Sequence, residues 1–101
     1  MNRPSRLPDD TVAARLATLP GWTHRDGKLL REFRFTDFSA AFAFMTRAAL
    51  RAEQLDHHPD WFNVYNRVKV QLSTHDADGV TELDFLLAEA MNRFAGEATA
   101  Q

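Results

Sequence analysis

The strongest constraint on the fold is a unit that occurs twice along the chain, a predicted β-hairpin followed by an amphipathic helix. The two units lie at about residues 21–55 and 60–95 and share no obvious residue identity. Two hairpins supply four antiparallel strands, and amphipathic helices need a sheet face to cover. With a further helix ahead of the first hairpin, the pattern predicts an α+β fold in two layers. Its order is α-β-β-α-β-β-α, with a four-stranded antiparallel sheet covered on one face by helices.

The first hairpin is predicted from its turn residues. Asp26-Gly27 is a dipeptide favoured in two-residue turns, and it separates a short run from a longer one that ends at Phe35. Phe33 and Phe35 lie on one side of that longer strand. Arg31 falls on the same side and interrupts the apolar pattern.

The second hairpin is predicted from an alternating, valine-rich run between Asp60 and Thr74. Asn66 interrupts the alternation, and asparagine tolerates positive φ. We therefore predict two strands, over about 60–64 and 67–74, joined at Tyr65-Asn66. One long strand is the alternative.

Helix signals lie at both ends of the chain. Asp9 and Asp10 supply first-turn carboxylates after Pro8. Thr81 stands three residues before Asp84, a spacing typical of an N-terminal capping box. Apolar residues at helical spacing support both helices, namely Val12, Leu16 and Leu19 in the first and Leu83, Leu87, Ala90 and Phe94 in the last.

Between the hairpins, Thr36-Asp37 begins the longest predicted helix. A stripe of apolar residues at helical spacing predicts its packed face, for the core or for a subunit contact: Phe38, Phe42, Met45, Ala49 and Ala52. Pro59 disfavours a helical conformation at His58. The helix must therefore stop before the adjacent His57 and His58.

Composition narrows the class of protein. A chain of 101 residues has the size of one domain, which we assign to 8–96, with flexible tails at 1–7 and 97–101. The formal charge is −2 without a long basic run, which argues against binding nucleic acid or a membrane surface. The longest apolar run, Ala40 to Met45, is too short to span a bilayer. Zero cysteines fit a reducing compartment, so we predict a cytoplasmic protein.

Three of the four histidines lie around the second hairpin. His57 and His58 stand in the loop that leaves the long helix, and His75 follows the last strand. If the hairpin ends converge, the three imidazoles share one rim. Carboxylates are dense nearby in the sequence, at Glu53, Asp56, Asp60, Asp76 and Asp84. An imidazole titrates near neutral pH, so one histidine can act as an acid while another acts as a base.

Three other interpretations stay open on spacing alone. The histidines could be solvated loop residues without a function. They could bind zinc through three imidazoles, although adjacent histidines rarely direct both rings to one ion. Ser73, His75 and Asp76 could form a nucleophilic triad, although the sequence has no G-x-S-x-G elbow.

The stretch that begins at Glu53 resembles the signature of the pterin-4a-carbinolamine dehydratases. That family's pattern has a polar residue, a His-His-Pro triplet, an aromatic residue, another histidine and an aspartate, at set gaps. Every position is present here: Glu53, His57, His58, Pro59, Tyr65, His75 and Asp84. The resemblance extends to PGW at 20–22 and REFRFTDFSAAFAFMTRAAL at 31–50, and it covers about residues 8–95.

The resemblance implies an activity and an assembly. Members of the family are four-stranded antiparallel sheets covered by helices, and they assemble as dimers or tetramers. They remove water from a 4a-hydroxytetrahydropterin to give the quinonoid dihydropterin, which recycles the cofactor of aromatic amino acid hydroxylases. The reaction needs neither a metal nor a cofactor. Two alternatives are a role as dimerisation cofactor of a transcription factor and a role in molybdopterin metabolism.

The resemblance also implies roles for single residues. His57 and His75 would form the acid/base pair, and His58 would hold the pterin. Asp84 would orient His75 while also capping the last helix. The other substrate-binding candidates are Glu53, Asp56, Ser73, Thr74, Asp76 and Trp22, the last as a stacking wall or else as a core residue. Pro59 and Tyr65 would have supporting structural roles.

Overall fold

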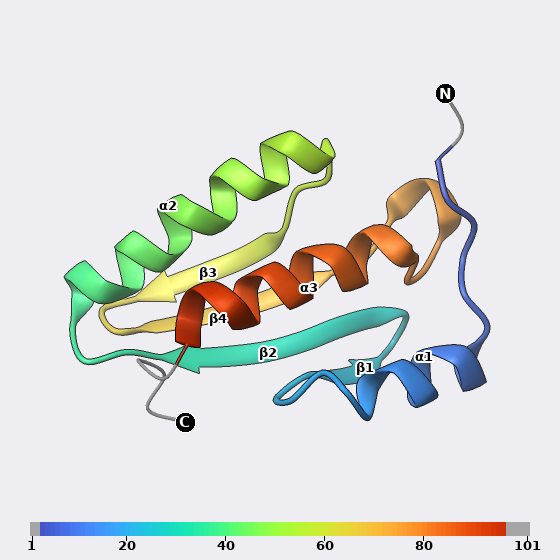
Figure 1. Ribbon diagram of the computed structural model, residues 1–101, viewed down its shortest axis with the longest axis horizontal. Coiled ribbons are helices and arrows are strands. Elements are labelled where there is room, and N and C mark those ends of the chain that lie inside the picture. Colours follow the sequence, from blue (N-terminus) through green and yellow to red (C-terminus); the bar gives the residue numbers. More distant parts are fainter. Residues whose placement is uncertain (1–2, 97–101) are drawn as a thin grey trace.

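The computed structural model describes residues 3–96 and contains a four-stranded sheet with its helices on one side (Figure 1). In chain order the elements are α1 (Asp9–Leu16), β1 (Thr23–Arg25), β2 (Lys28–Arg34), α2 (Phe38–Leu55), β3 (Asp60–Val64), β4 (Arg67–Leu72), the 3-10 helix η1 (His75–Ala77) and α3 (Glu82–Ala95). Neighbouring strands are antiparallel, in the order β1-β2-β4-β3. The predicted fold class and element order are confirmed.

Both predicted hairpins form, and their turns differ in which residues take a positive φ. Asp26 and Gly27 have φ values of 54° and 74°, the paired positive values of a two-residue turn between twisted strands. In the second hairpin the positive φ lies at Tyr65 (52°), so the expectation that Asn66 carries it is wrong. Asn66 instead donates from its side-chain amide to the Phe35 carbonyl at 2.8 Å, which ties this turn to the end of β2.

One face of the sheet is apolar and packs under the helices. Its buried side chains alternate with exposed ones, as the period of a strand requires: Leu29, Phe33, Val68, Val70 and Leu72. Arg31 falls on this face as the sequence indicated, at its margin. Its guanidinium lies 4.3 Å from the centroid of the Phe33 ring, and Nη1 donates to Asn92 Oδ1 at 2.6 Å. Burial lowers the pKa of Arg31.

The helix α2 packs on the sheet with a different row of residues from the predicted stripe. Its buried side chains are Ala41, Phe44, Ala48 and Ala52, so only Ala52 of the stripe is buried. The small alanines let the helix lie close to the sheet, and the Phe44 ring fills the space beside Phe33, at 4.7 Å between centroids. Of the two alternatives for this stripe, core packing does not hold for the exposed Phe38 and Phe42, and a subunit contact stays a prediction.

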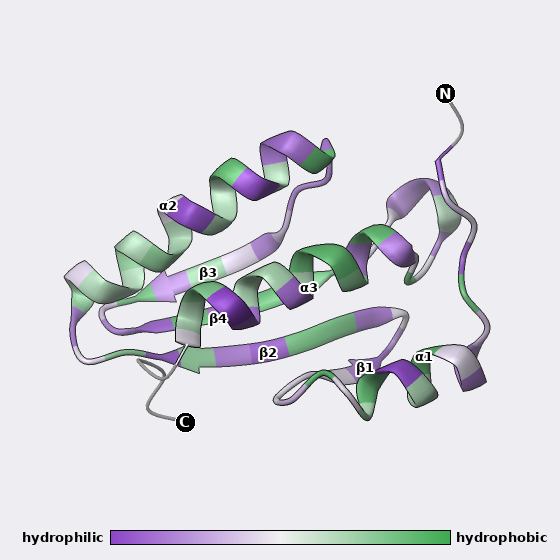
Figure 2. Ribbon diagram, in the orientation of Figure 1, coloured by the Kyte–Doolittle hydropathy of each residue, from purple (hydrophilic) through white to green (hydrophobic). Residues whose placement is uncertain are grey.

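As a result, the outer face of α2 exposes large apolar side chains among its polar ones. Phe38 and Phe42 are 48% and 54% exposed, and their rings lie 5.7 Å apart. Leu50 is exposed on the same helix. Apolar colouring covers most of the N-terminal half of α2 (Figure 2). An apolar surface of this kind indicates a contact with another molecule.

The segment ahead of α1 lies along the loop that precedes α3 (Figure 1). Leu7 N–H donates to the Val80 carbonyl at 2.8 Å, and Arg6 Nη1 donates to the Asp78 carbonyl at 3.3 Å. Arg6 and Leu7 belong to the expected flexible tail 1–7, of which residues 1–2 lie outside the described residues, as does the expected C-terminal tail 97–101. No helix within 3–96 is both long enough and apolar enough to cross a membrane.

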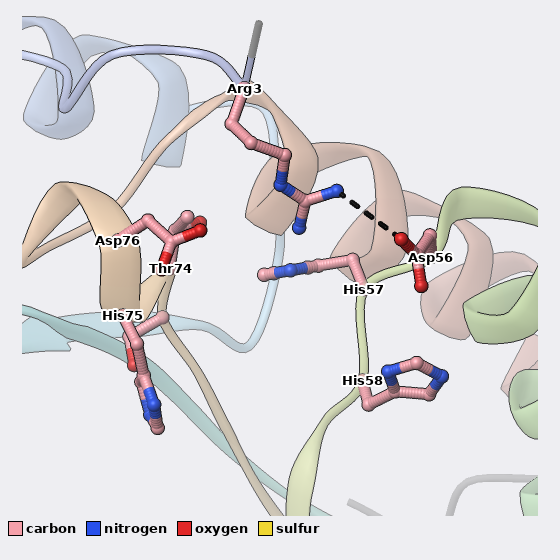
Figure 3. Close-up of a pocket in the computed structure, with 8 residues that line it drawn as sticks. Arg3, Asp56, His57, His58, Thr74, His75 and Asp76 are labelled. Carbon is pink, nitrogen blue, oxygen red and sulfur yellow. Dashed lines mark ion pairs between the residues drawn. The ribbon is translucent and has the colours of Figure 1, made fainter. Parts of the chain in front are cut away.

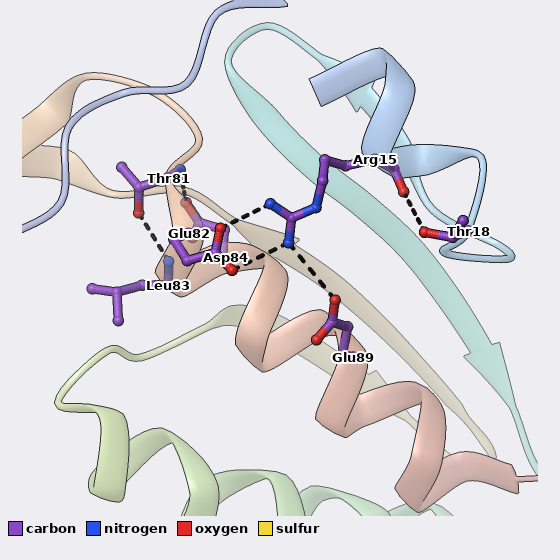
Figure 4. A network of polar contacts seen from close by, with 7 residues as sticks. All are labelled: Arg15, Thr18, Thr81, Glu82, Leu83, Asp84 and Glu89. Carbon is purple, nitrogen blue, oxygen red and sulfur yellow. Dashed lines mark hydrogen bonds and ion pairs between the residues drawn. The ribbon is translucent and has the colours of Figure 1, made fainter. Parts of the chain in front are cut away.

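A single arginine links α1 to α3. Arg15 Nη1 donates to Glu82 Oε1 at 2.8 Å, and Nη2 lies 3.8 Å from Glu89 Oε2 (Figure 4). The Arg15 guanidinium also lies 4.5 Å from the centroid of the Phe85 ring. The hydrogen bond to Glu82 raises the pKa of Arg15, and the same bond lowers the pKa of Glu82.

Candidate active site

The end of α2 positions the two adjacent histidines. Asp56 takes the left-handed conformation (φ 50°) just after the helix, and His57 N–H donates back to the Ala52 carbonyl at 3.0 Å. Hydrogen bonds of this kind close many helix C-termini and redirect the chain. As a result, His57 is buried, with 5% of its surface exposed, whereas the His58 side chain is 57% exposed.

All three histidines line one open pocket of about 300 Å³ (Figure 3). Its walls come from the N-terminal segment, the end of α2 and the chain from the end of β4 into η1. The lining residues are Arg3, Asp56, His57, His58, Ser73, Thr74, His75 and Asp76. The structure therefore brings the three imidazoles together with most of the substrate-binding candidates, from segments far apart in the sequence.

The buried histidine of the pocket is held by a buried carboxylate. His57 Nε2 lies 2.5 Å from Asp84 Oδ1, and neither side chain is more than 5% exposed. The other carboxylate oxygen, Oδ2, accepts from Thr74 Oγ1 and from the Thr81 backbone N–H, each at 2.9 Å. Asp84 thus completes the predicted capping box of α3 (Figure 4). The same carboxylate also binds His57.

Each hydrogen bond around Asp84 can be assigned a donor and an acceptor. Leu83 N–H donates to Thr81 Oγ1 at 3.2 Å. Thr74 Oγ1 donates to Asp84, so in the 2.8 Å contact between the two hydroxyls Thr81 is the donor. A carboxylate oxygen only accepts, so with Asp84 in that form His57 Nε2 carries the hydrogen in their contact. The other ring nitrogen, Nδ1, has no hydrogen-bond partner among residues 3–96.

The partner of Asp84 corrects one expectation. The resemblance implied that the Asp84 carboxylate orients His75, but the carboxylate contacts His57 instead. The start of α3 lies against the end of α2 at this point, and that tertiary contact decides which imidazole the carboxylate reaches.

His58 has an exposed partner one turn back on α2. Its Nε2 lies 2.6 Å from Glu53 Oε1, and the Glu53 side chain is 77% exposed. Glu53 does not line the pocket itself. Its contact with the pocket residues is the one to His58.

His75 lies on the wall opposite His57, at the start of η1 (Figure 3). The loop is closed on itself, because Thr74 N–H donates to the Gly79 carbonyl at 2.8 Å. His75 is exposed, and none of the described residues forms a hydrogen bond with its ring. This imidazole can therefore turn toward a ligand.

Two candidates from the sequence lie away from the pocket. Trp22 is buried against Phe33, with ring centroids 5.9 Å apart, and its Nε1 donates to Asn92 Oδ1 at 2.8 Å. The stacking-wall interpretation of Trp22 is wrong, and the alternative of a core residue is right. Tyr65 lies in the turn between β3 and β4, at the end of these strands remote from the histidines (Figure 1). Pro59 follows His58 and directly precedes β3, so it separates the histidine pair from that strand.

The open alternatives find little support in this geometry. Within residues 3–96 no group of three histidine, aspartate or glutamate side chains is arranged to hold a metal ion. The Nε2 atoms of His57 and His58 face two different carboxylates. No hydrogen bond joins Ser73 to His75 in the described chain, so a nucleophilic triad is not formed.

Sequence reasoning missed one residue of the pocket, Arg3. Its side chain reaches from the N-terminal segment over His57 and lies 4.0 Å from Asp56 Oδ2 (Figure 3). The sequence around Arg3 has no helical or strand period, and only the tertiary path of the segment brings it to the site.

Comparisons with known proteins agree on the family. A family model described as pterin 4 alpha carbinolamine dehydratase matches residues 5–94. Proteins of Brucella ovis and Brucella abortus, each named "Putative pterin-4-alpha-carbinolamine dehydratase", are 53% identical over 94 residues, which cover 91% of this chain and 97% of theirs. The crystal structure of a transcriptional coactivator/pterin dehydratase from Brucella melitensis matches with a TM-score of 0.89 at 52% identity, covering 91% of this chain and 100% of that one.

Proposed function

Since the chain belongs to the pterin 4 alpha carbinolamine dehydratase family, we propose that it removes water from a 4a-hydroxytetrahydropterin. The product is the quinonoid dihydropterin, and the reaction recycles the pterin cofactor of aromatic amino acid hydroxylases in the cytoplasm. The observation that carries the proposal is the buried pair of His57 and Asp84, beside a pocket that also holds His58 and His75.

The reaction needs one acid and one base. The bond from C4a to the hydroxyl oxygen breaks, and that oxygen leaves as water once it has gained a proton. The hydrogen on N5 departs as a proton, and its electron pair forms the new double bond between C4a and N5. Two imidazoles of opposite protonation state satisfy this balance near neutral pH.

His57 is the base in this proposal. Its Nδ1 takes the N5 proton, and Asp84 stabilises the imidazolium that results, as a buried carboxylate does for a catalytic histidine in other enzymes. His75, on the opposite wall, donates the proton to the leaving hydroxyl. Its exposed position lets water restore that proton after each turnover.

The remaining pocket residues bind the pterin. Asp56 accepts from the donor-rich pyrimidine edge of the ring, and His58, held by Glu53, orients the ring. The hydroxyl of Thr74 is committed to Asp84 and its N–H to the Gly79 carbonyl, so Thr74 supports the site through Asp84, and the Ser73 backbone lines the pocket. Asp76 lies beside His75 at the rim.

The test is a dehydration assay. A phenylalanine hydroxylase generates 4a-hydroxytetrahydropterin in situ, and formation of the quinonoid product is followed by absorbance. We expect His57→Ala and His75→Ala each to lose about 10²–10⁴-fold in rate, toward the low end because the uncatalysed reaction proceeds by itself. His24→Ala is the control, since His24 lies in β1 outside the pocket. A folded wild type that is no faster than buffer would overturn the proposal.

A second candidate function is binding of a protein partner. The related crystal structure is described as a transcriptional coactivator as well as a pterin dehydratase, and the outer face of α2 exposes large apolar side chains in this chain. The partner would be the dimerisation segment of a transcription factor. If this function is correct, Phe42→Arg abolishes binding of such a segment in sedimentation experiments, while His57→Ala leaves it intact. A substrate from molybdopterin metabolism is a third candidate, which the same dehydration assay tests by exchanging the pterin.

We also propose a homodimer or homotetramer. Two surfaces favour it: the outer face of α2, and the edge strand β3 with its exposed Phe62 and Val64, next to the exposed Tyr65 of the turn that follows. An unpaired strand edge offers hydrogen-bonding groups to a second sheet. Sedimentation of the wild type, Phe42→Arg and Phe62→Lys would assign each surface, and a wild type that stays monomeric at high concentration would exclude both.

A further inference from the structure

One charged group of the pocket has no part in the proposed reaction, the guanidinium of Arg3. It is the one lysine or arginine side chain that lines the pocket in the described chain. The Arg3 side chain is only 35% exposed, and none of its nitrogens donates a hydrogen bond to a residue within 3–96. A guanidinium has five N–H donors, so its donors are available to a ligand in the pocket.

Arg3 is held near the pocket by the residues that follow it. Leu7 N–H bonds to the Val80 carbonyl, and Arg6 bonds to the Asp78 carbonyl. The Arg6 side chain also lies directly on Gly79, where an added Cβ would come within 2.4 Å of Arg6 Cδ. The absence of a side chain at Gly79 therefore leaves room for the Arg6 side chain, and from the same segment Arg3 reaches over His57 (Figure 3).

Arg3 and Asp56 form a donor and an acceptor side by side. The distance from Arg3 Nη1 to Asp56 Oδ2 is 4.0 Å, too long for a hydrogen bond. The Asp56 side chain is 89% exposed, so its oxygens are also available. The pair matches any ligand edge that presents an acceptor next to a donor, and a cyclic amide presents such an edge.

A pterin carries one such cyclic amide, with the C4 carbonyl beside N3–H. C4 is bonded directly to C4a, the carbon that loses the hydroxyl. A clamp on this edge would therefore position the reacting carbon next to His57, which lies beneath Arg3 in the pocket (Figure 3).

We propose that Arg3 and Asp56 together bind the cyclic amide of the pterin, with Arg3 donating to the C4 oxygen and Asp56 accepting from N3–H. The inference rests on the proposed function, since it takes a pterin as the ligand. Arg3 lies outside residues 5–94, which the family model matches. Arg3 is a substrate-positioning residue and takes no proton.

The test compares two fluorescent probes, 2-amino-4-oxopteridine and 2,4-diaminopteridine, by equilibrium titration. The 4-amino group replaces the carbonyl acceptor with a donor, and N3 loses its hydrogen, so the second probe inverts the edge. We expect the wild type to bind the oxo probe about tenfold more tightly than the amino probe. Arg3→Met should weaken binding of the oxo probe about tenfold and remove most of the preference for that probe. Asp56→Asn should reduce the same preference.

The control is Arg34→Met, which removes the same charge on β2 outside the pocket and should bind both probes as the wild type does. If Arg3→Met keeps the wild-type affinities and preference, the inference is overturned, and the dehydration assay still decides the proposed function separately. If the wild type binds neither probe, the pterin function fails and the clamp fails with it.

Discussion

The two walls of the pocket hold their histidines in opposite ways. His57 is buried, and its ring is bonded to Asp84, which itself accepts from Thr74 and Thr81. His75 stands at the start of an exposed loop without a ring partner among residues 3–96. In the proposed mechanism this difference becomes a division of labour, in which Asp84 holds the tautomer of one imidazole while the other adjusts to the substrate and exchanges protons with water.

The largest effect should come from removing the charge behind His57. In Asp84→Asn the amide oxygen is favoured at the side where Thr74 Oγ1 and Thr81 N–H donate, which turns the amide NH₂ toward His57. His57 Nε2 must then accept, and the hydrogen moves to Nδ1, where the base needs a lone pair. We expect kcat to fall by about 10²–10⁴-fold.

The readout that separates this effect from a general loss of structure is the tautomer. Nitrogen-15 NMR of His57 should show the hydrogen on Nε2 in the wild type and on Nδ1 in Asp84→Asn. Far-UV circular dichroism checks that the variant folds. An active variant, or an inactive one with an unchanged tautomer, would contradict the proposed role of Asp84.

The contrast between the walls can be sharpened by comparing stability with activity. His57→Gln should lose activity and also about 1–3 kcal/mol of unfolding free energy, because it disturbs the hydrogen bond of a buried carboxylate. His75→Gln should lose activity while its unfolding free energy stays within about 0.5 kcal/mol of wild type, since the ring is exposed. Urea denaturation measures both, and equal losses of stability would remove the distinction between a fixed and an adjustable histidine.

The sequence could predict those features of the fold that depend on residues close together in the chain. The turn at Asp26-Gly27 and the capping box at Thr81 depend on residues a few positions apart, so local patterns identified them. The packed face of α2 was not identified, because the row through Ala41 and Phe44 competes with the bulkier row through Phe38, and side-chain size favoured the wrong one.

In the candidate site, the contacts between residues far apart in the sequence could not be predicted either. A motif places His57, His75 and Asp84 in order along the chain, but the packing of α3 on α2 decides that Asp84 reaches His57. The chain path that brings Arg3 to the pocket depends on contacts with residues more than 70 positions away, such as that between Leu7 and Val80. Spacing in the sequence carries no information about such contacts.

A smaller effect should follow from breaking the hydroxyl relay behind Asp84. Thr74→Val keeps the shape of the side chain and removes a donor to Asp84 Oδ2, and it also removes the acceptor of the Thr81 hydroxyl. We expect a loss of about 1–3 kcal/mol in unfolding free energy, with a smaller fall in kcat than Asp84→Asn causes.

The matched control is Thr46→Val, whose hydroxyl bonds to the Phe42 carbonyl on the exposed side of α2. This change should alter stability by no more than about 0.5 kcal/mol. If Thr74→Val and Thr46→Val have the same unfolding free energy, the hydrogen bonds of the Thr74 hydroxyl do not stabilise the pair of Asp84 and His57.

The smallest effect concerns the carboxylate two residues before Asp84, in the same first turn of α3. Glu82 is bonded to Arg15, which lowers its pKa below the ordinary value of 4.5, but its side chain is 47% exposed. A lowered folded pKa means that this contribution to stability is present above the ordinary pKa and is lost as the pH falls through the folded pKa. Because both partners are partly exposed, we expect Glu82→Gln to cost less than about 1 kcal/mol at pH 7 and to flatten the decline of stability in acid. Melting temperatures between neutral pH and strongly acidic pH measure this slope. A cost as large as that of Thr74→Val would mean that exposed ion pairs hold α3 as firmly as its buried network does.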